Sequence, residues 1–479
     1  MTERTFTLPD QRRFAALSGD HNPLHLDALV ARRSLLGGVA VHGMHALLWA
    51  LDCLAAQNSF SCFEKLRVNF ERGVLVGQTV QCTWKLEETR WVGRITGDSG
   101  TLVRISLVPI TVPPSPWRGA TETPRVECAE HDFSDLAQLS GELDLALPDS
   151  WRDLFPHLAA ASPPVMVAAL LASTRLVGMT CPGLHSIYSA LQLTYAAPPG
   201  APEPGDGRLH YQVLRADPRV RILDLTIKAG PLSGVVNTLV RPKPFAQPRL
   251  AEVLQAVPPS AFARQNALVI GGSRGLGELA AKLLVAGGAR VTVTWRQGEA
   301  DALARAEEAK SLGFALQTMR FDVSAPPVAP PPDKAYTHLY YFATPHIRHG
   351  GAGQFNPAAF AEFMECYVSG FARTVDWFRP QAEADACVWY PSSVFLTEMN
   401  PGFPEYTAAK ACGEVLCQHL ARQLAPMTFV TPRLPRLPTD QTQTLSATAM
   451  ADGVITLLNA FLPQTADGRA PSARRQPTP

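Results

Sequence analysis

The sequence predicts an α+β part followed by an α/β part. In the α+β part, an apolar helix followed by alternating strands occurs twice, in residues 1–112 and again in residues 126–245. Alternation of apolar and polar residues indicates antiparallel strands with one face on a core, so each repeat is predicted to be a helix wrapped by a sheet. In the α/β part, residues 264–462, a strand, a glycine-rich turn, a helix and a second strand follow one another, which indicates a doubly wound parallel sheet.

Length and composition allow about three domains, at a prior of about 150 residues for each. The chain has 479 residues, 46% of them apolar, and its 43 basic and 42 acidic residues give a net charge of +1. A balanced charge predicts neither a nucleic-acid nor an acidic-membrane partner. The chain starts without an apolar signal core and has no apolar run of about 18 residues, so we expect no membrane insertion and a cytoplasmic protein.

The nine cysteines form no Cys-x-x-Cys pair and have no histidine at ligand spacing. Scattered thiols of this kind are expected to be reduced and mostly buried. The sequence therefore predicts no metal site.

The first repeat carries an acid and an imidazole on one short segment. Asn22 and Pro23 lie between Asp20 and His25, and Pro23 fixes its own φ and disfavours helix at Asn22. Two titratable groups on a stiff loop suit acid/base chemistry at one substrate carbon. An apolar helix begins at Gly43, and its first N–H groups lack intrahelical partners, which makes a suitable place for an oxyanion.

The segment Gly19-Asp20-His-Asn-Pro-Leu-His25, with His42-Gly43 downstream, resembles the signature of MaoC-like (R)-specific enoyl-thioester hydratases, which have the hotdog fold. The resemblance covers roughly the first hundred residues. It implies that Asp20 and His25 are catalytic, that the N–H of Gly43 binds the thioester oxygen, and that the substrate is an acyl thioester on acyl carrier protein or coenzyme A. The alternative reading of the residues is a capped loop, with Asp20 as an N-cap and His25 as a surface residue.

The second repeat lacks this chemistry. A helix is expected over Pro164–Val177, and strands are expected over residues 186–195, 209–214, 220–227 and 234–240. Neither Asn-Pro-x-His nor His-Gly accompanies them, so we interpret residues 126–245 as a second, catalytically silent hotdog. Pairing two hotdogs covers an open sheet edge of each. The pair resembles the double hotdog of eukaryotic-type hydratases, although here the first half keeps the motif.

Proline-rich segments separate the predicted domains, at Val112–Gly119 and Arg241–Pro248. Prolines deny backbone donors and interrupt regular structure, so both segments are predicted to be linkers. The final residues, 465–479, are polar and Pro-rich, and disorder is expected there.

The α/β part opens with a predicted βαβ unit. Asn266–Ile270 is a short apolar strand, Gly271–Gly277 a glycine-rich turn, Glu278–Ala286 an apolar helix and Ala289–Trp295 the next strand. A glycine-rich turn alone is a weak signal, but between a strand and a helix it indicates a dinucleotide site.

Further on, Ser393, Tyr406 and Lys410 supply a hydroxyl, a phenol and an ammonium group. Tyr406 and Lys410 are four residues apart and share a helix face, where Lys410 can lower the pKa of the phenol. With the glycine turn, they resemble the short-chain dehydrogenase/reductase family over residues 264–462. The resemblance implies Tyr406 as the acid/base, Lys410 as its electrostatic partner and Ser393 as the residue that orients the carbonyl. The alternative is an ordinary pair on a helix surface.

The same resemblance implies cofactor contacts from the glycine turn and, for the adenine, from a later acid: Gly271, Ser273, Gly275, Gly277 and Asp322. Arg274 and Arg296 are cations where the ribose 2′ substituent would lie, and no acidic residue ends the second strand. This pattern favours a 2′-phosphate, so the predicted cofactor is NADPH. The alternative is that both arginines are solvated surface charges.

Three segments depart from the family pattern. The Asn-Asn-Ala-Gly of the family is Tyr341-Phe342-Ala-Thr344 here, its helix Asn aligns with Tyr367, and its Pro-Gly is missing from residues 432–439. Reductase modules of polyketide synthases also lack Asn-Asn-Ala-Gly, so the first departure does not by itself exclude reduction.

The two resemblances imply consecutive steps on one carbon. A 3-oxoacyl thioester would be reduced with NADPH, and the 3-hydroxyacyl product would be dehydrated, in fatty-acid or polyketide-like assembly. Two alternatives remain open: a non-catalytic accessory subunit that binds acyl chains, and the same chemistry run toward hydration and oxidation in fatty-acid breakdown. The carrier, the chain length and a homodimeric state are also left open.

Overall fold

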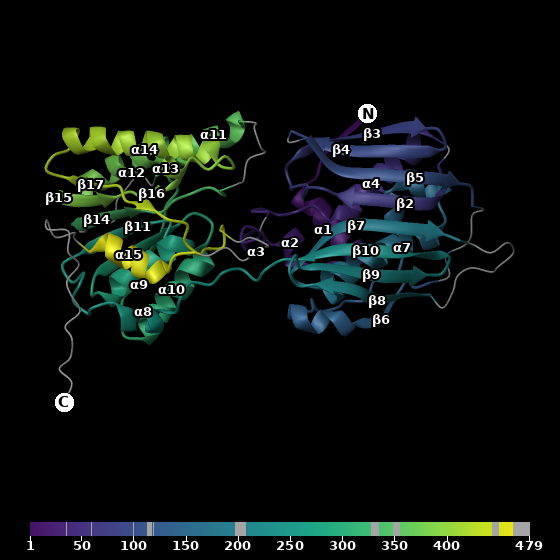
Figure 1. Ribbon diagram of the computed structural model, residues 1–479, viewed down its shortest axis with the longest axis horizontal. Coiled ribbons are helices and arrows are strands. Elements are labelled where there is room, and N and C mark those ends of the chain that lie inside the picture. The colour runs from purple at the N-terminus through teal and green to yellow at the C-terminus, as the bar shows by residue number, and fades with distance from the viewer. Residues whose placement is uncertain are drawn as a thin grey trace. The chain divides into compact units, whose positions relative to one another are not determined.

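The computed structural model describes residues 1–34, 36–58, 60–98, 100–112, 117, 119–196, 207–326, 335–347, 355–442 and 450–462. The chain forms two compact units, Met1–Lys243 and a second one that starts at Pro244 (Figure 1). The tail predicted to be disordered, residues 465–479, lies outside the described residues. No described helix combines the length and the apolar character that a bilayer span requires.

The first unit contains one ten-stranded sheet in the order β1-β3-β4-β5-β2-β7-β10-β9-β8-β6. Its strands are β1 (Thr2–Thr5), β2 (Cys62–Phe70), β3 (Thr79–Glu87), β4 (Arg90–Gly97), β5 (Gly100–Ile110), β6 (Ser140–Asp144), β7 (Ser186–Tyr195), β8 (Arg208–Asp217), β9 (Ile222–Ala229) and β10 (Leu232–Val240). If the strands of each half are numbered 1 to 5 along the chain, both halves have the order 1-3-4-5-2 from the edge of the sheet to its centre. They meet where β2 pairs with β7 in antiparallel register, so a single sheet runs through both halves.

The helices of this unit are α1 (Leu8–Ser18), α2 (Pro23–Leu26), α3 (Ala28–Ala31), α4 (Gly43–Gln57), α5 (Trp151–Leu154), α6 (Pro156–Ala161) and α7 (Pro164–Arg175). Each half contributes one long apolar helix, α4 or α7, to a common hydrophobic core, where Leu47, Leu51, Leu170 and Leu171 are all at most 1% exposed. Helices that are apolar on every side are expected where a sheet wraps around them. The two halves therefore share one core.

Two elements differ from the expected pattern. The strand predicted over residues 220–227 starts at Ile222, because Arg221 has a φ of 54° and belongs to the turn before it. The helix predicted to end at Val177 ends at Arg175 and continues as a π-helical turn, η2 (Leu176–Thr180). Periodicity does not distinguish an α-helical from a π-helical last turn.

The second unit contains a six-stranded parallel sheet in the order β13-β12-β11-β14-β15-β17. Its strands are β11 (Asn266–Ile270), β12 (Arg290–Trp295), β13 (Leu316–Arg320), β14 (Tyr336–Tyr341), β15 (Ala382–Trp389) and β17 (Thr428–Val430), and a separate short pair consists of β16 (Ser392–Ser393) and β18 (Arg433–Leu434). In order along the chain this sheet reads 3-2-1-4-5-6, the order of a Rossmann-like doubly wound fold.

Helices cover both faces of this sheet (Figure 1). The helices of this unit are α8 (Leu250–Ala256), α9 (Gly275–Ala286), α10 (Glu299–Ser311), α11 (Pro357–Met364), α12 (Gly370–Phe378), α13 (Phe395–Glu398), α14 (Pro404–Gln423) and α15 (Gly453–Phe461). Along β11, Ala267 and Val269 face a core with α9, while Leu268 and Ile270 face a second core with α12. Because α8 packs in the first of these cores, the unit starts before residue 264, where the α/β part was predicted to begin.

Candidate functional site

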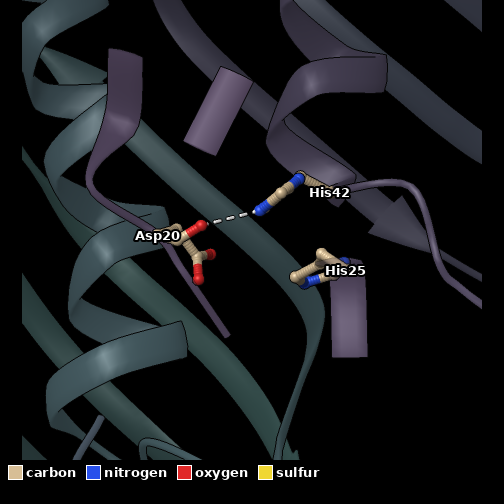
Figure 2. A group of neighbouring side chains, drawn as sticks. All are labelled: Asp20, His25 and His42. Atoms are coloured by element: carbon tan, nitrogen blue, oxygen red, sulfur yellow. Dashed lines mark hydrogen bonds between the residues drawn. The ribbon is translucent and has the colours of Figure 1, made fainter. Parts of the chain in front are cut away.

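In the first unit, Asp20, His25 and His42 converge from three elements (Figure 2). Helix α1 ends at Ser18, and its C-cap, Gly19, has a φ of 75° that turns the chain toward Asp20. His25 lies on the short helix α2, which Asn22 caps through the backbone N–H of Leu24. The acid and the imidazole are therefore held by a helix end and a helical turn rather than by an open loop.

The ring of His25 is fixed by one hydrogen bond and one stack. Its Nδ1 lies 2.8 Å from the carbonyl oxygen of Ala40, so Nδ1 carries the proton and Nε2 is left as an acceptor. The ring stacks on that of His42, with centroids 3.9 Å apart. His25 thus presents an oriented basic nitrogen.

Burial sets the protonation of the acid and the base. Asp20 is 2% exposed, and its burial raises its pKa, although the charge of His25 and a hydrogen bond from Thr174 act in the opposite direction. Burial also lowers the pKa of His25, against the charge of Asp20. A pair whose pKa values are pushed toward the uncharged forms can supply an acid and a base at the same pH.

His42 contacts both members of this pair, through its stack on His25 and its hydrogen bond with the backbone of Asp20 (Figure 2). Its Nδ1 is 2.9 Å from Oε1 of Gln11, and its Nε2 is 3.0 Å from the carbonyl oxygen of Asp20 (Figure 2). Burial, followed by the charge of His25, keeps the pKa of His42 well below its usual range. One ligand atom from each of Asp20, His25 and His42 lies within 4.8 Å of the others, but both ring nitrogens of His42 already face oxygen atoms. A cation would have to displace these contacts, so the arrangement favours acid/base chemistry over metal binding.

Helix α4 begins at Gly43, where the sequence placed the start of an oxyanion site. A first helical residue has no intrahelical acceptor for its N–H. A Cβ on Gly43 would lie 3.0 Å from the ring of Phe70, so the glycine lets the helix end approach that ring. The ring of Phe70 in turn contacts Tyr188 of the second half, at a centroid distance of 5.5 Å.

The second half completes the surroundings of Asp20. The hydroxyl of Thr174 donates to Oδ2 of Asp20 at 2.7 Å, and Nδ2 of Asn22 donates to the carbonyl oxygen of Gly178 at 2.9 Å. Gly178 lies on η2, and a Cβ there would be 2.2 Å from Oδ1 of Asp20. The half without a motif of its own therefore positions the acid of the other half.

One hollow of about 290 Å³ lies on the exposed face of the sheet, away from Asp20 and His25. Cross-strand neighbours on β2, β4 and β5 line it, among them Arg67, Arg94 and Arg104. Its walls contain neither the acid nor the base, so it is not the acid/base site.

In the second unit, the glycine-rich turn has the geometry of a dinucleotide-binding loop. Gly271 and Gly275 have φ values of 74° and 60°, and a Cβ on Gly277 would lie 2.2 Å from the carbonyl oxygen of Gly271. Gly271 and Gly275 are thus required for the backbone conformation of the turn, and Gly277 is required for the close approach of the helix to the carbonyl of Gly271. No described side chain caps α9, whose N-cap is Arg274, so the first N–H groups of this helix remain available for a phosphate. These residues fit a dinucleotide.

The predicted cofactor-binding side chains differ in their exposure and in their charged neighbours. Ser273 is 7% exposed in the turn, and Arg296 is exposed directly after β12. Burial raises the pKa of Asp322, but hydrogen bonds from Ser324 and the charge of Arg296 outweigh it and lower that pKa. Arg274 forms an ion pair with the carboxylate of Asp440. Of the two predicted 2′-phosphate cations, only Arg296 is exposed.

Ser393, Tyr406 and Lys410 lie together on β16 and α14. Burial raises the pKa of Tyr406 to about 12, and the neighbouring hydroxyl of Ser393 acts in the opposite direction. Nζ of Lys410 donates to the carbonyl oxygen of Pro391 at 2.7 Å, and burial lowers its pKa to about 7. The predicted lowering of the phenol pKa by Lys410 is not seen, because burial dominates both groups.

Two of the departures from the family pattern contact each other. The phenol of Tyr367, at the position of the helix Asn, is 2.5 Å from the hydroxyl of Thr344, which ends the segment that replaces Asn-Asn-Ala-Gly. Nζ of Lys410 lies 4.0 Å from the centre of the Tyr367 ring and 4.8 Å from that of Tyr390. Aromatic faces attract an ammonium group, so the two rings add to the hydrogen bond that Lys410 makes with Pro391.

The sequence did not single out four residues that the structure places at these sites: Gln11, Thr174, Gly178 and Asp440. Each acts on a motif residue from a distant part of the chain and belongs to no motif of its own. The nearest signal was the apolar helix of the second repeat, because Thr174 lies in its last turn and Gly178 in the π-helical turn that follows. Nothing in its pattern indicates which residues meet Asp20.

Residues 1–103 match the family model described as MaoC like domain. No curated protein matches the chain. Solved structures similar to the chain include a dehydrogenase/reductase from Sinorhizobium meliloti 1021, with 23% identity, 40% of this chain and 79% of that chain covered and a TM-score of 0.33. A short chain dehydrogenase from Burkholderia cenocepacia J2315 in complex with NADP has 21% identity, coverage of 38% and 78% and a TM-score of 0.34. An angucycline C-6 ketoreductase with bound NADP has 19% identity, coverage of 36% and 74% and a TM-score of 0.32.

Proposed function

Since residues 1–103 match a MaoC-like domain, we propose that the first unit is a 3-hydroxyacyl-thioester dehydratase, and that the second unit is a reductase that makes its substrate from a 3-oxoacyl thioester. The observation that carries the proposal is the convergence of Asp20 and His25 beside the uncapped start of α4 at Gly43. The acyl group is carried by acyl carrier protein or coenzyme A. In fold terms, the proposal makes the first unit a double hotdog with one catalytic half, residues 1–112, and one supporting half, residues 126–245.

Dehydration needs a base for the Cα proton, an acid for the leaving hydroxyl and a donor for the thioester oxygen. His25 takes the Cα proton on Nε2, because its Nδ1 is held by the carbonyl oxygen of Ala40. Asp20, whose pKa is raised by burial, gives its proton to the hydroxyl that leaves as water. The N–H of Gly43 stabilises the enolate-like oxygen between these events.

In the reductase, the glycine turn and Arg296 would hold a nicotinamide dinucleotide, and the bound cofactor would supply hydride for C3 of the substrate. Ser393 orients the carbonyl and Tyr406 gives the proton to its oxygen. The electrostatic influence of the Ser393 hydroxyl on Tyr406 supports this division, because the phenol and the hydroxyl must be neighbours to share the substrate oxygen. Lys410 contributes charge behind the phenol when it is protonated.

The dehydratase is tested by supplying a 3-hydroxyacyl thioester to wild type, His25→Ala and Asp20→Asn. Removal of one acid or base is expected to lower the rate of enoyl formation about 10²- to 10⁴-fold. If both variants form enoyl product at the wild-type rate, Asp20 and His25 have no role in catalysis.

The reductase is tested by NADPH consumption with an acetoacetyl thioester in wild type and Tyr406→Phe. A loss of about 10²-fold or more is expected for the variant, because it lacks the proton donor. Equal rates in both proteins would remove Tyr406 from the mechanism.

A second candidate for the second unit is an accessory role without cofactor. The ion pair of Arg274 with Asp440 and the replacement of the helix Asn by Tyr367 favour it. NADPH fluorescence decides between the two roles, since an accessory unit produces neither fluorescence enhancement nor a thermal shift with cofactor.

A further inference from the structure

Arg274 is held by a carboxylate that belongs to no part of the glycine turn. Its Nη1 forms an ion pair with Oδ2 of Asp440, and the two side chains are 22% and 8% exposed. An ion pair shielded from water is stronger than one on an open surface. Arg274 is therefore largely neutralised before any ligand arrives.

The same carboxylate lies at the mouth of the glycine turn. A Cβ on Gly275, the first residue of α9, would lie 3.9 Å from Oδ1 of Asp440 and 4.0 Å from Cγ2 of Thr439. The start of a helix in this position attracts the pyrophosphate of a dinucleotide. A carboxylate and a pyrophosphate beside the same helix end repel each other. Both also compete for the positive charge of Arg274.

Asp440 is kept in place by its neighbours as well as by Arg274. The N–H of Thr439 donates to the hydroxyl of Thr442 at 2.8 Å, and Oε1 of Gln441 accepts from the N–H of Ile347 at 2.9 Å. These bonds do not involve the carboxylate, so replacement of Asp440 by its amide should preserve the turn.

We propose that Asp440 determines cofactor affinity and selectivity in the second unit, an inference that rests on the proposed reductase function. While Arg274 is paired with Asp440, it cannot give its full charge to a 2′-phosphate. The wild-type chain therefore relies on Arg296 for discrimination between NADPH and NADH, and it discriminates less than a chain in which Arg274 is also free. Removal of the carboxylate raises the affinity for both dinucleotides, because it relieves repulsion of the pyrophosphate. It raises the affinity for NADPH further, because the freed Arg274 can bind the 2′-phosphate that NADH lacks.

The test measures dissociation constants of NADPH and NADH by fluorescence titration for the full chain. Asp440→Asn is expected to bind NADPH about tenfold more tightly than wild type, a change typical of one added charge-assisted contact, and to gain less for NADH. Arg274→Gln in the Asp440→Asn background should remove the extra gain for NADPH. Glu307→Gln is the matched control, because it also removes one carboxylate of an ion pair, with Lys310 at 3.8 Å on exposed α10.

An Asp440→Asn protein that binds NADPH no better than wild type, or that gains equally for NADH, overturns the proposal while leaving the reductase intact. Failure of wild type and Asp440→Asn to bind either dinucleotide instead contradicts the proposed reductase function. The two failures are thus distinguishable.

Discussion

At the scale of single residues, Asp20 depends on a hydroxyl from the other half of its unit. Thr174 donates to its carboxylate at 2.7 Å, and both side chains are at most 4% exposed. Hydrogen bonds to charged groups contribute about 1.5–3 kcal/mol, so this contact affects both the orientation and the pKa of the acid. Thr174 is therefore a positioning residue for the dehydratase.

Replacement of Thr174 by Val should lower the rate of dehydration about tenfold, because the loss of the hydrogen bond that orients Asp20 raises the activation free energy by about 1.4 kcal/mol. The missing donor also raises the pKa of Asp20 further, so the alkaline limb of the pH–rate profile should move to higher pH. Thr174→Ser keeps the hydroxyl and should restore the wild-type profile. A Val variant whose rate and alkaline limb equal those of wild type would show that the contact does not position the acid.

His45 makes the first unit sensitive to acid. Its ring is fully buried and stacks on Phe14 at a centroid distance of 4.6 Å, and burial lowers its pKa to about 3 from the usual 6.5. Between these values the unfolded chain binds a proton that the folded chain excludes, so stability is present above pH 6.5 and is lost as the pH falls below it.

At about pH 5, this one group should cost about 2 kcal/mol of unfolding free energy relative to neutral pH. His45→Phe cannot take up the proton, so its free energy of unfolding should fall less between about pH 7 and 5 in denaturant titrations. His157→Gln is a matched control, because His157 is exposed. Equal slopes for wild type and the Phe variant would contradict the assignment.

At the scale of elements, the π-helical turn η2 brings its backbone against Asp20. Gly178 is required there because a Cβ would lie 2.2 Å from Oδ1 and 2.5 Å from Cγ of Asp20. Such turns are frequent at functional sites, where one extra residue changes the path of a helix. The end of the second long helix is therefore shaped to the acid of the first half.

Gly178→Ala should displace the Asp20 carboxyl group and lower dehydration by about 10²-fold, because misplacement by about 1 Å can cost that much. NADPH consumption with an acetoacetyl thioester should not change. Gly38→Ala is a suitable control, since its added Cβ would have its nearest contact at 3.9 Å. Wild-type dehydration by the Gly178 variant would mean that the carboxyl group does not need this close contact.

The elements themselves could largely be predicted from periodicity, and the contacts between them could not. The strand Asn266–Ile270 has the bounds that its apolar run indicates, and Ser186–Tyr195 has those that its predicted repeat of strands indicates. The turn at Arg221 was missed because a positive φ at a non-glycine residue leaves no pattern in the sequence. The pairing of Arg274 with Asp440 was missed because the two residues are distant in sequence and meet only in the folded unit.

At the scale of the whole molecule, the first unit acts as one structure with two unequal halves. The repeated strand order 1-3-4-5-2 and the pairing of β2 with β7 create one sheet and one core from both halves. The sequence motif identified which half bears Asp20 and His25. It could not show that the second half supplies Thr174 and Gly178, because their contacts with Asp20 come from tertiary structure alone.

The central claim is that one chain performs reduction and then dehydration on the same acyl thioester, with separate residues for each step. The most direct measurement follows the thioester products by mass spectrometry when wild type, His25→Ala and Tyr406→Phe receive an acetoacetyl thioester and NADPH. Wild type should yield the enoyl product, His25→Ala should accumulate the 3-hydroxyacyl species while NADPH is consumed at the wild-type rate, and Tyr406→Phe should return the substrate unchanged. Enoyl product at the wild-type rate from His25→Ala, or 3-hydroxyacyl product at the wild-type rate from Tyr406→Phe, would contradict the account.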